Sequence, residues 1–121
     1  MLRELTSHKV NGLNDAIVIG VIDEPGSGGA CHRYHIGIPM IDPADCSINF
    51  QDGPIQEVGF NGLSNEALLA VVEDRLKGFQ SGQYACHENA VALMHVQHAM
   101  QWLLSRTRER LQRGVEGTSQ R

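Results

Sequence analysis

Residues 87–118 read HENAVALMHVQHAMQWLLSRTRERLQRGVEGT, and this stretch decides how the rest of the chain must fold. Its apolar residues recur at helical spacing, with Glu88 near the expected positive end and Gly114 and Gly117 where the helix should stop. The pattern predicts one long helix that ends in a cluster of arginines and a glycine-bounded tail. The apolar stripe consists of Leu93, Met94, Val96, Met100, Leu103, Leu104 and Leu111.

A second amphipathic segment, residues 65–80, comes just before this helix. Ser64 or Asn65 suits the N-cap, and Glu66 is favourably placed in the first turn. Its stripe consists of Leu68, Leu69, Val72, Leu76 and Phe79, and Ser81-Gly82 ends it. Because the connection to the next helix is short, the two helices should form an antiparallel hairpin.

The first half of the chain is rich in short β-type segments. We expect polar, turn-rich residues 1–14, followed by strands at 16–22, 32–38, 46–50 and 55–60 with a connector at 39–43. The glycine-rich residues 23–29 lack the Lys-Ser/Thr ending of a P-loop, so a hairpin connection is the better interpretation than a phosphate cradle. The predicted fold is α+β: a small β-rich domain of residues 1–60 and a helical hairpin domain of residues 61–121.

Charge is unevenly distributed along the 121 residues. The net charge is −4, yet five of the ten basic residues and two acidic ones lie in the last 16 positions, so that segment carries +3 and the remainder −7. An acidic body with one basic end favours a small anion over a DNA or RNA polymer, which needs an extended basic track. No apolar run approaches the roughly 20 residues of a membrane span, and no signal peptide begins the chain, so we expect a cytoplasmic protein.

The arginines near the end of the long helix are the first candidate binding residues. Arg106, Arg110 and Arg113 have i, i+4, i+7 spacing and share one helical face, whereas Arg108 points roughly the other way. Guanidinium groups on one face suit phosphate oxygens. The alternative is a solvated face in which arginines pair with Glu109, and the spacing alone leaves both interpretations open.

A nucleotide ligand would also need a platform for its base. Phe79 and Tyr84 lie around the hairpin bend, and Asn89 in the first turn of the second helix could bind a base edge or a ribose hydroxyl. Asn89 and Arg106 are 17 residues apart on one helix, which corresponds to about 25 Å. One small ligand cannot contact both in one chain, but two hairpins packed antiparallel about a two-fold axis would create shared pockets. Interface candidates are Met94, Met100 and Trp102.

Catalytic motifs are missing from the sequence. There is no G-x-S-x-G or H-E-x-x-H motif and no pair of carboxylates on a helix face. Cys31, Cys46 and Cys86 show no C-x-x-C spacing, and His95 and His98 alone do not supply the three or four ligands of a zinc site. We expect reduced thiols and binding without turnover, with no catalytic residues, no cofactor and no metal.

Several stretches of the second half, taken together, resemble the phage Thoeris anti-defence sponge proteins, whose helical hairpin is shared with the phage anti-CBASS sponges. The stretches are GPIQEVG at 53–59, NGLSNEALL at 61–69, DRLKGFQ at 74–80, CHENA at 86–90, RTRER at 106–110 and RGVEGT at 113–118. The resemblance covers roughly the last 65 residues, and residues 1–50 contribute no diagnostic motif.

The resemblance implies a non-enzymatic sponge in the host bacterial cytoplasm. Such proteins bind cyclic nucleotide-like immune messengers, notably glycocyclic ADP-ribose isomers made by TIR-domain enzymes, and some form hexamers that also take up cyclic di- or trinucleotides. By this resemblance Phe79 would stack on adenine, Asn89 would hydrogen-bond the ligand, and Arg106 with Arg110 would hold the phosphates. We add Tyr84, Arg113, Gly117 and Thr118 as further ligand-binding candidates.

The resemblance also implies a homo-oligomer, either a dimer or a trimer of dimers, with its pocket between protomers. Two other functions stay open at this point. One is a small nucleotide hydrolase that uses His95 and His98, and the other is an α-helical adaptor or virion-assembly protein whose arginines meet a protein partner.

Overall fold

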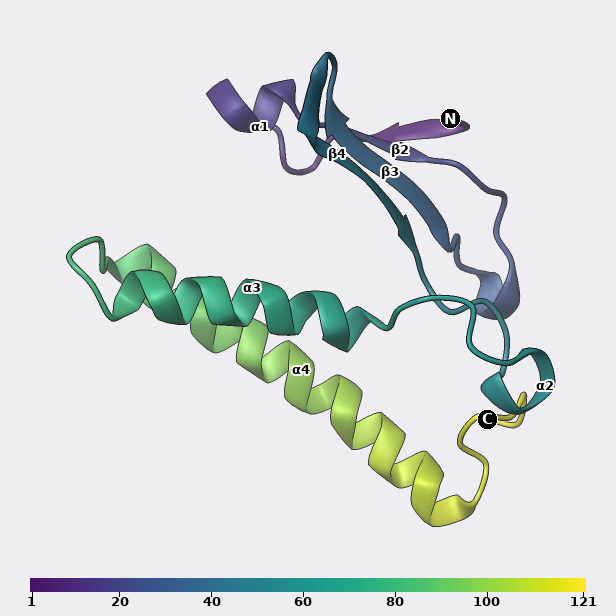
Figure 1. The fold of residues 1–121 in the computed structure, drawn as a ribbon. Helices are drawn as coiled ribbons and strands as arrows, with labels where there is room; N and C mark the ends of the chain where they lie inside the picture. The colour runs from purple at the N-terminus through teal and green to yellow at the C-terminus, as the bar shows by residue number, and fades with distance from the viewer. The chain divides into compact units, whose positions relative to one another are not determined.

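The computed structural model describes residues 1–121 as an antiparallel four-stranded sheet followed by helices (Figure 1). The α+β class is therefore confirmed. The chain divides into two compact units, Met1–Leu63 and Ser64–Arg121. None of the helices combines the length and the apolar character that a bilayer-crossing segment requires.

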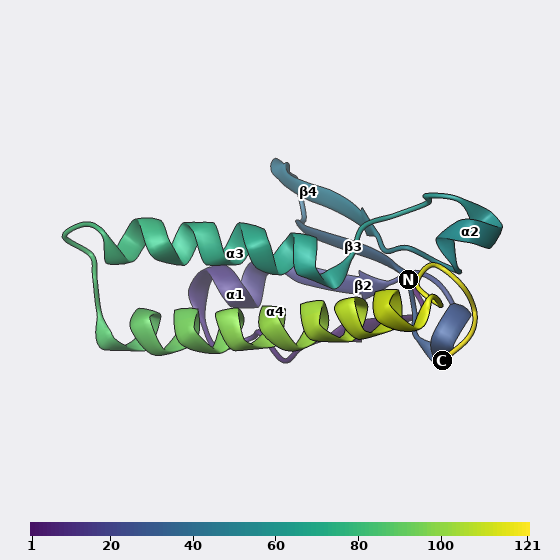
Figure 2. The same cartoon turned by 90° about the horizontal axis from the view of Figure 1, so that it is seen from below.

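The second unit is a pair of antiparallel helices, α3 (Asn65–Gln80) and α4 (His87–Arg113), which lie side by side (Figure 2). Both predicted helices are confirmed. Ser64 is the N-cap of α3, because its Oγ accepts a hydrogen bond from the Ala67 N–H at 3.1 Å. No side chain of α3 is fully buried, and Met94 and Trp102 of α4 are 45% and 77% exposed. Two helices alone leave much of their apolar surface in water.

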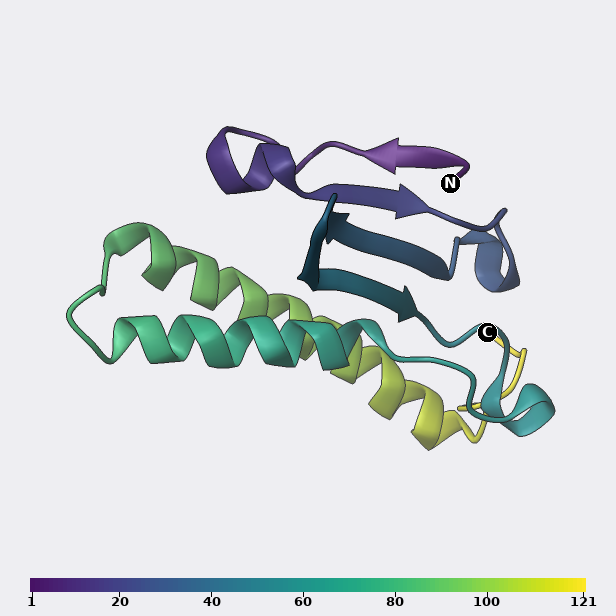
Figure 3. The same ribbon diagram turned by 45° about the horizontal axis from the view of Figure 1, so that its top comes forward.

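The first unit is built on strands β1 (Arg3–Leu5), β2 (Val18–Val21), β3 (Arg33–Ile38) and β4 (Ile41–Asn49), in the order β1-β2-β3-β4 (Figure 3). Every neighbouring pair is antiparallel. Val21 is the only fully buried apolar side chain, so the core of this unit is very small.

The N-terminal residues are more regular than their sequence predicts. The expectation of a turn-rich segment at residues 1–14 holds only for residues 7–11, because β1 lies before them and the short helix α1 (Gly12–Ala16) begins after them. Strand β1 forms through its backbone: Arg3 pairs with Val21 and Leu5 with Ile19 on the edge of the sheet. A three-residue edge strand has no hydrophobic alternation by which the sequence could reveal it.

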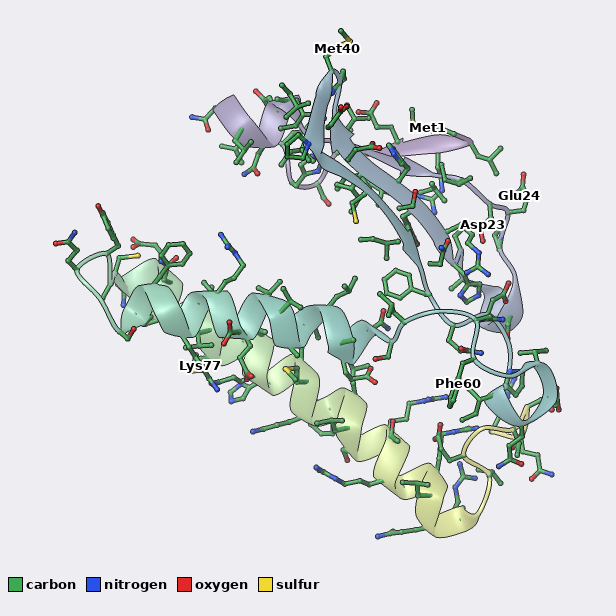
Figure 4. All side chains as sticks on the ribbon, viewed as in Figure 1. Met1, Asp23, Glu24, Met40, Phe60 and Lys77 are labelled. Atoms are coloured by element: carbon green, nitrogen blue, oxygen red, sulfur yellow. The ribbon has the colours of Figure 1, made fainter.

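Strand β4 is longer than predicted. The expected connector at residues 39–43 is wrong, since only Pro39 and Met40 make the turn and Pro43 lies inside β4. Proline is acceptable there because β4 is an edge strand. Met40 stands at the tip of this turn with φ +71° and points away from the sheet, 96% exposed (Figure 4).

The strand predicted at residues 55–60 is also wrong. One helical turn, α2 (Ile55–Val58), lies there instead, between Pro54 as N-cap and Gly59 at φ +74°. Side-chain amides hold this loop: Gln51 Nε2 donates to the Gly59 carbonyl at 2.8 Å, and Asn61 Nδ2 donates to the Asp52 carbonyl at 2.7 Å. These side-chain hydrogen bonds take the place of the backbone pairing that a strand would need. The alternation of apolar and polar residues at 55–60 gave no sign of them.

The glycine-rich loop joins β2 to β3, which are antiparallel, so the predicted hairpin connection is confirmed. The loop includes the 3-10 turn Ser27–Gly29, and its Ser27 N–H donates to Asp52 Oδ1 at 3.2 Å. At the base of the loop, Asp23 accepts the backbone N–H groups of His32 and Arg33. Desolvation acts to raise the pKa of Asp23, but these donors outweigh it and hold the pKa below its ordinary value. Asp23 and Asp52 therefore already accept the backbone N–H groups of His32, Arg33 and Ser27, which a bound phosphate would need as donors.

Candidate ligand-binding site on the helical hairpin

The hairpin bend carries two exposed aromatic side chains. Phe79 lies in the last turn of α3 and is 43% exposed, while Tyr84 lies in the loop before α4 and is 71% exposed. The guanidinium carbon of Arg75, one turn earlier, sits 5.5 Å from the centre of the Phe79 ring. This cation–π contact helps to hold the ring in place.

Asn89 lies in the first turn of α4, where the backbone is fastened by two side chains. The Cys86 Sγ accepts from the Asn89 N–H at 3.4 Å as N-cap, and Gln80 Oε1 accepts from the Cys86 N–H at 3.0 Å. Both bonds use backbone donors, so the bend positions Asn89 through its main chain.

At the other end of α4, Arg110 is buried, with 7% of its surface exposed. Four of its five N–H groups donate to the tail: Nε to Glu116 Oε2 (3.1 Å), Nη1 to the Gln120 carbonyl (2.7 Å), and Nη2 to the carbonyls of Val115 (2.9 Å) and Thr118 (3.1 Å). Only Arg110 among the side chains of α4 is buried. A buried guanidinium is tolerated here because a carboxylate and three carbonyls surround it.

The tail itself begins with a Schellman turn. Gly114 adopts the left-handed conformation, its N–H donates to the Leu111 carbonyl, and the Val115 N–H donates to the Arg110 carbonyl at 3.0 Å. Thr118 donates both its backbone N–H and its hydroxyl to the Val115 carbonyl. Gly117, with φ +79°, is buried inside this loop.

The arginines of α4 differ in how their charge is balanced. Arg110 pairs with Glu116, and Arg113 pairs with Glu109 in the surface i, i+4 arrangement that the sequence left open. Arg106 is exposed and takes part in none of the ion pairs of the structure. Arg106 is therefore the member of the predicted phosphate-binding set whose charge stays uncompensated.

The structure brings the predicted residues together as two groups. Phe79, Tyr84 and Asn89 lie in or beside the bend between α3 and α4, whereas the arginines lie in the last turns of α4 and Gly117 and Thr118 in the tail after it. The bend and the tail are at opposite ends of α4 (Figures 1 and 2). Two hollows exist elsewhere, one of about 340 Å³ beside His35 and Met40, and one of about 390 Å³ beside His98 and Trp102. None of the eight predicted residues lines either hollow.

The histidines proposed for a hydrolase make a ring contact, but no metal-binding group. The His95 and His98 rings are 6.5 Å apart and nearly perpendicular. No group of three or more His, Cys, Asp or Glu side chains suited to a metal ion converges in residues 1–121. All three cysteines are free thiols, as expected.

Comparison with known proteins identifies the hairpin. The family model "Acb2/Tad1, hairpin domain" matches residues 42–108, more than half of the chain. The chain belongs to this hairpin family. A relative, "Thoeris anti-defense 1" of Bacillus phage SBSphiJ7, is 49% identical over 75 residues, which are 62% of this chain and 53% of the relative. The match thus spans about half the length of that relative.

The family match places the predicted residues in two classes. Phe79, Tyr84, Asn89 and Arg106 lie within the matched residues 42–108, whereas Arg110, Arg113, Gly117 and Thr118 lie beyond them. Arg75, Gln80 and Glu116, which orient the ring, the bend and the tail, were missed by the sequence predictions. The i, i+4 spacing of Arg75 and Phe79 was the one signal that could have indicated such a role.

Proposed function

We propose that this chain is a phage anti-defence protein that binds a cyclic nucleotide-like immune messenger and withholds it from its effector without cleaving it. The observation that carries the proposal is the 49% identity to a protein named for opposing the Thoeris defence, over 62% of the chain. Cyclic ADP-ribose isomers made by TIR-domain enzymes are the proposed ligands, and cyclic di- and trinucleotides are a second class to test. The proposed site of action is the host bacterial cytoplasm.

The chemistry at the two ends of α4 supports this ligand class. A cyclic ADP-ribose isomer carries an adenine ring, ribose hydroxyls and a diphosphate. An exposed ring such as Phe79 can stack on the base, Tyr84 and Asn89 can supply further contacts, and the uncompensated Arg106 can bind phosphate oxygens. Arg113 would add positive charge beside it, and Gly117 and Thr118 would contribute tail backbone.

Because the two groups lie at opposite ends of α4, we propose that each pocket is completed by a second copy of the chain. Asn89 and Arg106 are about 25 Å apart along the helix, beyond the reach of one small ligand. A two-fold dimer of antiparallel hairpins would bring the bend of one protomer to the arginine end of the other. The exposed Met94 and Trp102 suit such contacts, and three dimers could assemble further into a hexamer.

Calorimetry with a panel of cyclic ADP-ribose isomers and cyclic di- and trinucleotides tests the ligand class. We expect saturable binding of at least one cyclic ADP-ribose isomer, and heat denaturation should release it intact. Recovery of a hydrolysed product would instead support the enzyme hypothesis. If no compound of the panel binds, the sponge function is wrong and a protein partner becomes the better explanation of the arginines.

Mixing two defective variants tests the shared pocket. Phe79→Ala and Arg106→Ala should each abolish tight binding, but in a mixed dimer one of the two pockets keeps Phe79 from one protomer and Arg106 from the other. Co-expressed variants should therefore regain about a quarter of the sites. An intrachain site would regain none.

A further inference from the structure

We infer that Arg75 is a positioning residue for the proposed ligand. Its guanidinium covers one face of the Phe79 ring, so a base stacks only on the other face, which is turned toward the bend. The inference rests on the proposed function for its ligand, whereas the contact between Arg75 and Phe79 is a property of the free chain. The guanidinium carbon lies over the ring, 5.5 Å from its centre.

The contact follows from the geometry of α3. Side chains of a helix lean toward its N-terminus, so the Phe79 ring lies over the turn that carries Arg75, four residues earlier. The distance of 5.5 Å is within the range of cation–π attraction. Because Phe79 is in the last turn of α3, the face opposite to Arg75 is turned toward the end of the helix and the bend.

No carboxylate draws the guanidinium of Arg75 away from the ring. Arg75 is exposed and takes part in none of the ion pairs of the structure. The ion pair of the same helix joins Glu73 to Lys77 at 3.6 Å and leaves Arg75 out. An arginine suits this place, since its planar guanidinium stacks on aromatic faces.

Coverage of one face has two consequences for a ligand. A base needs the space directly over the ring, and the guanidinium occupies that space on its own side, so one bend holds one base. The ring is also oriented before the ligand arrives, so less side-chain entropy is lost on binding. Tyr84 and Asn89, the other proposed contacts at the bend, come after Phe79 in the chain, on the side that stays open.

Direct binding of phosphate is the alternative role for Arg75. The guanidinium would then have to leave the ring to reach the ligand, and its contribution would not depend on an aromatic side chain at position 79. A positioning role acts only through the ring. The two roles therefore differ in whether the effects of substitutions at Arg75 and Phe79 are additive.

Proton NMR of the full-length, ligand-free protein tests the contact. Protons over the face of an aromatic ring resonate upfield, so the side-chain signals of Arg75 should move downfield in Phe79→Leu. The side-chain signals of Arg108, an exposed arginine near the other end of α4, are the control and should stay unchanged. Unmoved Arg75 signals would overturn the inference. In the wild type, the upfield shift should persist when ligand is added, and its loss would show that the base displaces the guanidinium.

A double-mutant cycle, measured by calorimetry with the cyclic ADP-ribose isomer that binds, tests the positioning role. Arg75→Ala should raise Kd about threefold, and Arg75→Lys less, because lysine keeps a cation near the ring. Phe79→Leu should raise Kd about fivefold, and the double variant Arg75→Ala/Phe79→Leu should raise it by the same factor. A rise of about 15-fold in the double variant would mean independent contributions and would refute the positioning role.

The two experiments fail in distinguishable ways. If the wild type binds none of the panel, the proposed function is wrong, while the NMR shifts of the free chain still decide whether Arg75 covers the ring. If the wild type binds and the two substitutions are additive, the proposed function stands and Arg75 has no positioning role. Circular dichroism of each variant should match the wild type, because both side chains are exposed on α3.

Discussion

The two ends of α4 are held in different ways. At the bend, a sulfur atom caps the helix at 3.4 Å, and the aromatic side chains of Phe79 and Tyr84 are largely open to water. At the other end, a Schellman turn closes the helix and a buried arginine binds the tail. The bend therefore presents apolar side chains beside a weakly capped helix start, while the other end presents the charge of Arg106 on the helix itself, before the tail that Arg110 binds.

The difference suits the proposed ligand. Stacking of a base on a ring tolerates some adjustment, because every base has a flat face. Phosphate recognition by hydrogen bonds depends more on donors that are already in place.

Arg106→Ala should weaken binding of the cyclic ADP-ribose ligand most. Loss of charge-assisted hydrogen bonds costs about 1.5–3 kcal/mol, or about 10- to 150-fold in Kd by calorimetry. The free energy of unfolding should scarcely change, because Arg106 is exposed and outside every ion pair of the structure. Arg108→Ala is the matched control, and equal losses in both variants would point to a general charge effect.

Phe79→Leu should have a smaller effect at the bend. Leucine keeps apolar contact but removes the aromatic face, and stacking contributes about 1–3 kcal/mol per base, so we expect about a fivefold rise in Kd, at the lower end of that range. Phe79→Tyr should keep most of the affinity. If leucine and tyrosine bind equally well, Phe79 does not stack on the base.

Gly114→Ala should lower the free energy of unfolding by about 1–2 kcal/mol in denaturant titrations, because alanine is strained in the left-handed conformation. No atom lies within 4 Å of the added carbon, so crowding would not contribute. Gly78→Ala beside the bend also meets open space, but inside helix α3, and should raise stability by about 0.5–1 kcal/mol. The same chemical change should thus have opposite signs at the two ends. Equal signs would show that the Schellman turn does not stabilise the free chain.

Cys86→Ser should produce the smallest change, a gain of about 0.5 kcal/mol in the free energy of unfolding, since serine is a preferred N-cap residue. Cys86→Ala would measure the contribution of the present cap. If it lowers the free energy of unfolding by less than the usual value of about 1 kcal/mol for loss of an N-cap, the sulfur caps the helix weakly. If serine instead destabilises the helix, the sulfur contact is stronger than its 3.4 Å distance indicates.

Local signals made the hairpin predictable. The stripes of α3 and α4, the Ser64 cap and the glycine after Arg113 all act within a few residues, and both helices form where these signals place them. The sheet was less predictable because its edges depend on distant partners. Strand β1 exists through pairing with β2, and Gln51 and Asn61 close residues 51–61 into a loop where apolar alternation indicated a strand.

For the candidate site, sequence patterns were enough to identify the available residues: aromatic side chains at a helical bend and arginines about 25 Å away on the same helix. Its spacing placed Arg106, Arg110 and Arg113 on one face and could not rank them. The folded chain ranks them: Arg110 is buried against the tail, Arg113 pairs with Glu109, and Arg106 has no ion-pair partner. The physical reason is that helical periodicity describes a face, whereas the charge left on that face depends on where the chain returns after the helix ends.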